Sequence, residues 1–321
     1  MTPSINRRGL VLGIAAGAAL TSGCATARRP AISLKGVALP SESVQMSAFT
    51  EDAQTGFVCR LCRYPTAGVA WVWAHVFEPG RVWSYTDDQL PTSGPLIDLA
   101  AAEVSYRQAG GADLTYRRTG PRAQPTLATL DARLAAHNNP RPEHGRGATP
   151  VRIQAELRSD TAQVGILPDR AEAKGKVDAV LTIGGRTVRV RGSGHFHEQP
   201  QSTPRFVDPF TWLRGSGEDV ALTFARGAKG PADLGGYLTA GGRTDAVTGF
   251  RITPPGPVRR YETELESGRR LSAEIRPTHT YWVRIYDGWR NSQIFPGEIE
   301  GRRFVGGLND WMSERLSYLP A

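Results

Sequence analysis

Cysteine is scarce in this sequence, and only Cys59 and Cys62 form a Cys-x-x-Cys spacing. No second Cys-x-x-Cys is present to complete a four-cysteine zinc site. Residues 57–64 alternate like a β-strand, and positions three apart on a strand face opposite sides, so an unstrained disulfide is not expected. We therefore expect two free, partly buried thiols, with a redox or metal-binding pair as the alternative.

Several other functional signals are missing. No Gly-x-x-x-x-Gly-Lys run is present to bind phosphate, and no Gly-x-Ser-x-Gly run marks a serine hydrolase. The chain is basic, with a formal net charge of +8, but its lysines and arginines are spread along strand-like segments and form no block. This distribution is typical of a solvated surface near anionic lipid and argues against nucleic-acid binding.

Long hydrophobic runs are also absent. The main one, residues 9–20, spans about a dozen residues, whereas a membrane-crossing helix needs about 20. Arg7 and Arg8 precede this run, and Cys24 follows it after small residues. This layout predicts that residues 1–27 are a bacterial export signal ending at a lipid-acceptor cysteine.

Two alternatives remain open for this signal. The small residues before Cys24 favour lipoprotein processing, although residues 25–27, Ala-Thr-Ala, also suit ordinary signal peptidase cleavage after Ala27. The Arg7-Arg8 pair resembles a twin-arginine motif but also fits general export. We expect a lipoprotein anchored in the membrane and facing the periplasm, with Ala25 after the cysteine favouring the outer membrane.

Hydrophobic residues recur with a period of two along most of the chain. Val69, Trp71, Trp73, His75 and Phe77 share one face of a predicted strand. The pattern predicts an all-β protein of two lipocalin-like antiparallel β-barrel or sandwich domains, over residues 36–203 and 204–321. Helices are expected at two places: residues 126–137, within a helix and loop insertion at 119–150, and a short C-terminal helix at 309–316.

The clearest functional segment is Gly192–Gln199, Gly-Ser-Gly-His-Phe-His-Glu-Gln, which precedes Trp212. If it is extended, His195 and His197 face one side, and Phe196 and Glu198 face the other. Two histidines on one face can bind a metal, but no third ligand stands at a diagnostic spacing, so no metal or other cofactor is expected. The histidines and Glu198 are candidates for proton transfer, and hydrogen-bonded structural histidines are the alternative.

This segment and its position between two β halves resemble the lipocalin-like carotenoid hydratase (hydroxyneurosporene synthase) family, which is related to fungal Diels–Alderases. The resemblance covers about residues 50–318. The family block usually reads Gly-x-Gly-Tyr-x-Asp-His-x-Trp-Gly. This chain keeps Gly192 and Gly194 but has His195 for the tyrosine, His197 for the aspartate, Glu198 for the histidine and Pro200 for the tryptophan.

The resemblance implies a cofactor-free hydratase, isomerase or cyclase acting on an apolar, isoprenoid-like or carotenoid-like molecule. His195, His197 and Glu198 are the candidate catalytic residues. The candidate substrate-binding residues are Phe196, Trp212, Trp73 and His75. The alternative function is a non-catalytic lipid-binding or pigment-binding lipoprotein, because one scaffold can carry unrelated functions. In both cases the expected ligand site is a groove between the two halves.

Replacing the proposed lipid-acceptor cysteine tests the export signal. The Cys24→Ser variant should move from the membrane fraction to the soluble periplasmic fraction, because it lacks the thiol that accepts the lipid. Fractionation followed by immunoblotting measures the change. Unchanged fractionation, or a mature chain beginning at Arg28, would contradict the prediction.

Overall fold

The computed structural model describes residues 31–141, 145, 147–164, 169–227, 234–286 and 288–312, without the side chains of 160–164 and 312. The predicted export signal, including Cys24, lies outside these ranges. The described residues from 32 onward form one compact unit. Regular structure in the described ranges is β, apart from the short 3-10 helix η1 (Pro65–Ala67). None of those residues belongs to a helix with the length and apolar character needed to cross a membrane.

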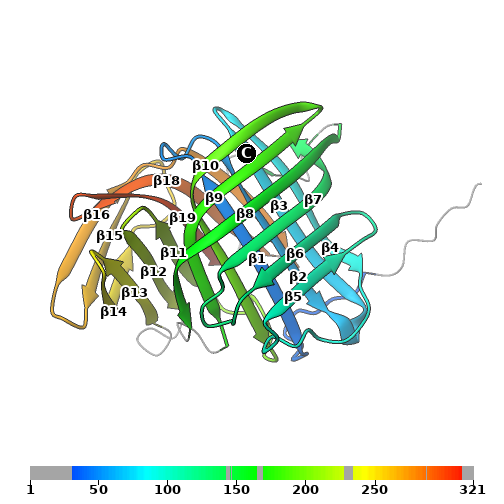
Figure 1. Cartoon of the computed structure of the whole chain (residues 1–321), viewed down its shortest axis with the longest axis horizontal. Helices are drawn as coiled ribbons and strands as arrows, with labels where there is room; N and C mark the ends of the chain where they lie inside the picture. The colour runs from blue at the N-terminus through cyan, green and yellow to red at the C-terminus, as the bar shows by residue number, and fades with distance from the viewer. Residues whose placement is uncertain are drawn as a thin grey trace, which may run out of the picture. The chain divides into compact units, whose positions relative to one another are not determined.

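The first sheet has ten strands in the order β4-β3-β2-β1-β10-β9-β8-β7-β6-β5. Its strands are β1 (Ser41–Phe49), β2 (Gly56–Tyr64), β3 (Val69–Glu78), β4 (Arg81–Pro91), β5 (Glu103–Gln108), β6 (Asp113–Thr119), β7 (Leu127–Asn138), β8 (Thr149–Val164), β9 (Ala171–Ile183) and β10 (Arg186–Gln201). A further pairing of β4 with β7 closes the sheet into a ring. Figure 1 shows the long strands β8, β9 and β10 side by side in green.

The second sheet has nine strands in the order β16-β15-β14-β13-β12-β11-β19-β18-β17. Its strands are β11 (Phe210–Ser216), β12 (Val220–Gly227), β13 (Leu234–Ala240), β14 (Arg243–Ile252), β15 (Arg259–Leu265), β16 (Arg270–Ile275), β17 (His279–Ile285), β18 (Gly288–Ile299) and β19 (Arg302–Met312). All the pairings are antiparallel, so the predicted all-β antiparallel architecture is confirmed. The first sheet ends at Gln201 and the second begins at Phe210, on either side of the division predicted at residue 203.

Side-chain alternation builds the core of the first sheet. Alternate residues of neighbouring strands point inward and form one apolar cluster, for example Val44, Leu61 and Val72. The hairpin between β9 and β10 turns at Gly184 and Gly185, whose φ angles of 56° and 89° suit a two-residue turn that other residues adopt only with strain.

Two predicted helices are wrong where the structure describes them. Residues 127–138 form β7, because Ala128, Leu130, Ala132 and Leu134 alternate inward into the core of the first sheet. Packing in the sheet outweighs the helical spacing of the leucines and the helix propensity of alanine. The expected C-terminal helix is contradicted at residues 309–312, which continue β19. Its remainder lies outside the described residues.

The second sheet covers the outer face of part of the first. Strands β1, β2 and β3 are therefore buried at every position, on both faces. An apolar cluster between the sheets joins Trp71 and Phe77 of β3 to Tyr281 and Ile294 of the second sheet.

The two cysteines of β2 lie on opposite faces of this doubly covered strand. Cys59 belongs to the inner core of the first sheet, whereas Cys62 belongs to the cluster between the sheets. Both are free, as predicted, but they are fully rather than partly buried. Burial raises the pKa of the Cys59 thiol to about 12, which argues against a redox role.

Candidate functional site

The segment Gly192–Gln199 lies in β10, between β1 and β9. Glycine is required at positions 192 and 194 because atoms of the neighbouring strands lie very close to them. A Cβ atom on Gly192 would lie 2.1 Å from the carbonyl oxygen of Phe49, and one on Gly194 would lie 2.2 Å from a methyl group of Val177. Both distances are shorter than any ordinary contact, so only glycine at these two positions lets the neighbouring strands approach β10 this closely.

The predicted alternation along β10 is confirmed. His195 and His197 lie on the face covered by the second sheet, and their ring centroids are 5.3 Å apart. Phe196 lies on the other face, in the inner core of the first sheet. Glu198 shares that inner face, where it contacts residues of β5 and β6. The backbone therefore separates Glu198 from the two histidines.

Glu198 is held by a buried ion pair inside the first sheet. Arg118 Nε lies 2.9 Å from one carboxylate oxygen, and the Tyr106 hydroxyl donates a hydrogen bond of 3.1 Å to the other. Burial raises the pKa of Glu198, and the charge of Arg118 opposes this rise. These contacts occupy both oxygens of the carboxylate, so Glu198 is well placed to stabilise the fold.

His195 faces a small void. Its Nε2 lies 3.4 Å from Glu172 Oε1, and neither ring nitrogen has a hydrogen-bond partner among the described residues. The adjoining cavity, which Arg214 also lines, has a volume of about 10 Å³, enough for about one water molecule. Burial lowers the pKa of His195 to about 3, so the imidazole is neutral at physiological pH.

Glu172 organises a buried polar network across the two sheets. Arg170 donates a hydrogen bond of 2.6 Å to it, and the Thr223 hydroxyl of β12 donates one of 2.8 Å. Burial alone would raise the pKa of Glu172, but Arg170, His195 and Lys174 overcome this effect and hold the pKa well below its usual range. Glu172 is therefore a carboxylate within this network.

Lys174 extends the network to the second sheet. Its Nζ donates hydrogen bonds to the carbonyl oxygen of Leu222, to Thr223 Oγ1 and to the Tyr237 hydroxyl, at 2.7, 2.9 and 2.6 Å. Burial lowers the pKa of Lys174 to about 7. Three acceptors match the three donors of an ammonium group, so these contacts suit the charged form of Lys174, which at this pKa coexists with the neutral amine near pH 7.

His197 has one bonded and one free ring nitrogen. Arg170 Nη2 lies 3.1 Å from His197 Nδ1, and because arginine only donates, Nδ1 must accept this hydrogen bond. The proton of the neutral ring then resides on Nε2, which is buried and has no hydrogen-bond partner in the described part of the chain. Burial and the neighbouring Arg170 and Arg60 lower the pKa of His197 well below its usual range, which favours this neutral tautomer.

His197 lines an opening between the two sheets, which we call the inter-sheet pocket. Its volume is about 490 Å³, within the range for small-molecule sites. The pocket is lined by six arginines: Arg60, Arg170, Arg205, Arg214, Arg226 and Arg290. Its main apolar residues are Phe206, Val207, Phe210, Trp212, Ala225 and Leu234. The pocket is thus basic on one part of its wall and apolar on another.

The predicted substrate-binding residues are distributed unequally around this pocket. Trp212 lines it, with the Arg170 guanidinium 4.0 Å from its ring centroid. Trp73 is not part of the lining but contacts two residues that are, the guanidinium groups of Arg60 and Arg290, each 5.0 Å from its ring centroid. His75 does not belong to the lining, and its Nδ1 forms a hydrogen bond of 2.8 Å with Ser84 Oγ. Phe196 belongs to the inner core of the first sheet.

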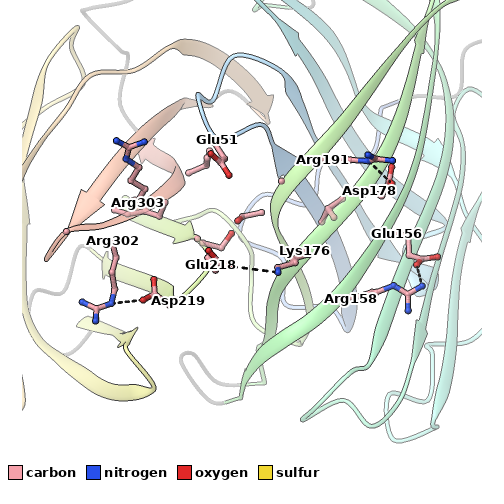
Figure 2. Close-up of a pocket in the computed structure, with 18 residues that line it drawn as sticks. Glu51, Glu156, Arg158, Lys176, Asp178, Arg191, Glu218, Asp219, Arg302 and Arg303 are labelled. Carbon is pink, nitrogen blue, oxygen red and sulfur yellow. Dashed lines mark hydrogen bonds and ion pairs between the residues drawn. The ribbon is translucent and has the colours of Figure 1, made fainter.

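A second groove, which we call the open groove, has a volume of about 770 Å³, and its lining includes Gly192 and Ser193. Figure 2 shows its charged side chains. These side chains are largely exposed, and most of them pair with one another: Arg158 with Glu156, Lys176 with Glu218, Arg191 with Asp178, and Arg302 with Asp219. Exposed charges of this kind, to which Glu51 and Arg303 add, are screened by water and bind a ligand more weakly than buried charges do. The inter-sheet pocket is therefore the better candidate site.

Sequence reasoning missed the arginines of the inter-sheet pocket. Arg60, on β2, shares its strand face with Val58 and Cys62, and Arg214 lies two residues after Trp212 on β11. A basic residue on the same face as buried aromatic and aliphatic residues was the available signal. No three His, Cys, Asp or Glu side chains gather around a possible metal position within the described ranges.

The fold and the pocket define a lipocalin-like protein of two antiparallel sheets with a small-molecule-sized site between them. The chain belongs to the family described as "Domain of unknown function (DUF7064)", which its sequence matches over residues 35–307. No curated protein matches the chain.

Solved structures share this fold. The structure of CghA with Sch210972 has a TM-score of 0.59 and 12% identity, covering 85% of this chain and 88% of CghA. CghA without that compound gives a TM-score of 0.52 at the same identity and coverage. A Nitrosomonas europaea protein described as an AttH (NE1406) gives 0.55 at 14% identity, covering 85% of this chain and 92% of that protein. At such identities the likeness shows the fold alone.

The buried neutral histidines predict acid sensitivity. An unfolded histidine has a pKa of about 6.5, whereas folded His195 has a pKa of about 3, so between these values only the unfolded state takes up the proton. Stability should therefore fall as the pH falls through this window, by at most about 1.4 kcal/mol per pH unit for this residue.

The His195→Gln variant tests this expectation. Its free energy of unfolding, measured by urea titration at pH 7 and pH 4.5, should fall less over this interval than that of the unmodified protein. The comparison variant is His279→Gln: burial also lowers the pKa of this histidine, but its hydrogen bond with the Gln54 carbonyl oxygen opposes the shift, so the variant should lose more stability over the interval than His195→Gln. Equal losses in His195→Gln and the unmodified protein would show that His195 is not the titrating group.

Proposed function

We propose that this protein binds a small unsaturated organic molecule in the inter-sheet pocket and acts on it without a cofactor, as an isomerase, hydratase or cyclase. The observation that carries the proposal is the buried His197 Nε2, which has no partner among the described residues and belongs to the pocket lining. A buried donor left without a partner is costly, and such groups concentrate at functional sites.

The neutral imidazole is suited to donating a hydrogen bond. Arg170 fixes Nδ1 as an acceptor, so Nε2–H is presented to an oxygen atom of the substrate. Such a donor stabilises the negative charge that develops on a carbonyl or enol oxygen in the transition state. Trp212 and Phe206 offer apolar surface for the carbon skeleton of the substrate.

The comparisons are in line with a small organic substrate. CghA, which shares the fold, has been crystallised with Sch210972. The resemblance to carotenoid hydratases suggests an unsaturated, isoprenoid-like skeleton as the finer assignment. The export signal further places the protein, in this proposal, at the membrane and facing the periplasm, anchored through lipid on Cys24.

The alternative is a carrier without chemistry. The strongly lowered pKa of His197 makes it a weak base, and Asp208, the only carboxylate among the described lining residues, is exposed at the pocket. A carrier would need the apolar wall but no proton donor.

Conversion of a cellular extract distinguishes the two functions. The protein, His197→Gln and His279→Gln are each incubated with a lipid extract of the source cells, and substrates and products are measured by mass spectrometry. An isomerase or cyclase yields a product of unchanged mass, and a hydratase yields one heavier by a water molecule. We expect conversion by the protein and by His279→Gln, and conversion slower by at least about 100-fold with His197→Gln.

The binding measurement completes the test. Because a transition-state donor contributes mainly to turnover, the His197→Gln variant should retain the same compound in pull-down with little loss of affinity. Retention of a compound by all three proteins with no conversion by any would establish the carrier. Equal conversion by all three would remove His197 from the mechanism.

A further inference from the structure

The buried charges around the inter-sheet pocket do not balance. Five of its arginines are at least nine-tenths buried: Arg60, Arg170, Arg205, Arg214 and Arg290. Glu172 is the buried carboxylate of this region, and it is already engaged by Arg170, Thr223 and Lys174. Four buried guanidinium groups are thus left without an ion-pair partner among the described residues.

These four arginines contact neutral partners instead. Arg60 donates to Ser43 Oγ at 3.0 Å, and Arg290 Nε donates to Ser292 Oγ at 3.1 Å. Each serine accepts only part of the donor capacity of a guanidinium group, which has five N–H bonds. Arg60 Nε has no partner within the described ranges.

Arg214 and Arg205 also contact only neutral groups. Arg214 Nη2 lies 3.5 Å from Ser47 Oγ, and Arg205 donates to Ser41 Oγ and to the carbonyl oxygen of Gln199. All the described acceptors of these two side chains are uncharged. The surplus of positive charge is therefore shared by the whole group.

The arginines are held in place by packing. Arg60 comes from β2 of the first sheet and Arg290 from β18 of the second, and both guanidinium groups pack against the ring of Trp73, each 5.0 Å from its centroid. A Cβ atom on Gly307 would lie 3.2 Å from the guanidinium carbon of Arg214, so glycine at this position leaves room for that side chain. The two sheets thus supply fixed cations from both walls of the pocket.

Burying unpaired cations opposes folding. Burial lowers the pKa of Arg60 well below its usual range, and the charges of Arg205, Arg170 and Arg290 lower it further. An arrangement that is unfavourable in the empty protein is expected where a ligand supplies the opposite charge.

We propose that the inter-sheet pocket binds an amphipathic organic anion, with its carboxylate on Arg60, Arg214 and Arg290 and its apolar body along Phe206 and Trp212. This assignment rests on the proposed function and names the substrate class of the same site. The planar guanidinium group pairs with a carboxylate through two parallel hydrogen bonds, which makes arginine well suited to this recognition. The adjoining apolar wall explains why a simple inorganic anion would leave the pocket partly unfilled.

Three probes of equal chain length test the charge preference. Dodecanoate, dodecanol and dodecylammonium are titrated into the full-length protein below their aggregation concentrations, and binding is followed by calorimetry. Dodecanoate should bind at least about tenfold more tightly than dodecanol, because only the anion forms charge-assisted hydrogen bonds. Dodecylammonium should show no binding at the same concentrations.

Two variants and a control connect the preference to the arginines. Arg60→Met and Arg290→Met keep apolar bulk beside Trp73 but remove one charge each, and both should reduce the dodecanoate preference severalfold while binding dodecanol unchanged. The control is Arg191→Met, which removes an exposed arginine that pairs with Asp178 in the open groove. The control should retain the full preference.

Thermal unfolding separates a binding role from a structural one. Without ligand, Arg60→Met should have a Tm equal to or higher than that of the unmodified protein, because an unpaired buried charge is removed. With dodecanoate, the rise in Tm should be smaller in the variant than in the unmodified protein. A lower Tm in the ligand-free variant, together with an unchanged dodecanoate preference, would identify Arg60 as a structural residue and overturn the proposal.

The outcomes for the two proposals are separable. Equal binding of dodecanoate and dodecanol overturns the anion assignment and leaves the proposed function intact. Failure of dodecanoate to bind also overturns the anion assignment, while the extract conversion by His197→Gln still decides the proposed function on its own. A preference that survives in both methionine variants overturns the role given to Arg60 and Arg290.

Discussion

Burial of both faces of β1, β2 and β3 is the constraint on which the rest of the structure depends. A closed sheet alone needs apolar residues only on its inner face, with polar residues facing water. Here the second sheet covers the outer face as well, so every residue there must find a partner in the protein. Where β3 faces β17 and β18, the partners are apolar. Where β9 and β10 face β11, β12 and β13, the partner residues are polar. This polar part of the interface contains the candidate site.

Glu172 makes the polar part of this interface possible. It is the carboxylate that Arg170, Lys174 and His195 share, and through Arg170 it also determines which nitrogen of His197 carries the proton. A single carboxylate cannot compensate the other arginines of the pocket, two of which, Arg214 and Arg290, come from the second sheet. The interface therefore changes from compensated charge near Glu172 to uncompensated charge at the inter-sheet pocket, and this change, rather than the shape alone, distinguishes the pocket from the open groove.

Alternation made much of the fold predictable from the sequence. The strand face shared by Trp71, Trp73 and Phe77, the Gly184-Gly185 hairpin and the separation of His197 from Glu198 all follow from a period of two. Strand β7 could not be predicted in this way. Alanine and leucine suit both a helix and a crowded core, and only the pairing with the rest of the sheet decides between the two. The buried arginines were also missed, since an arginine on a strand normally faces water, and only the apolar residues on the same strand face indicated that the second sheet encloses it.

The departures from the carotenoid hydratase pattern acquire a physical meaning at this interface. The family block usually places an aspartate where this chain has His197, next to Arg170 and on the pocket side of β10. Replacing a carboxylate by a neutral imidazole removes one negative charge from a wall that already holds several arginines. The glutamate at the next position does not restore it, because Glu198 faces the inside of the first sheet and pairs with Arg118. The neutral His197 thus leaves the positive charge of this wall uncompensated, and the ligand proposed for the pocket is one that carries its own negative charge.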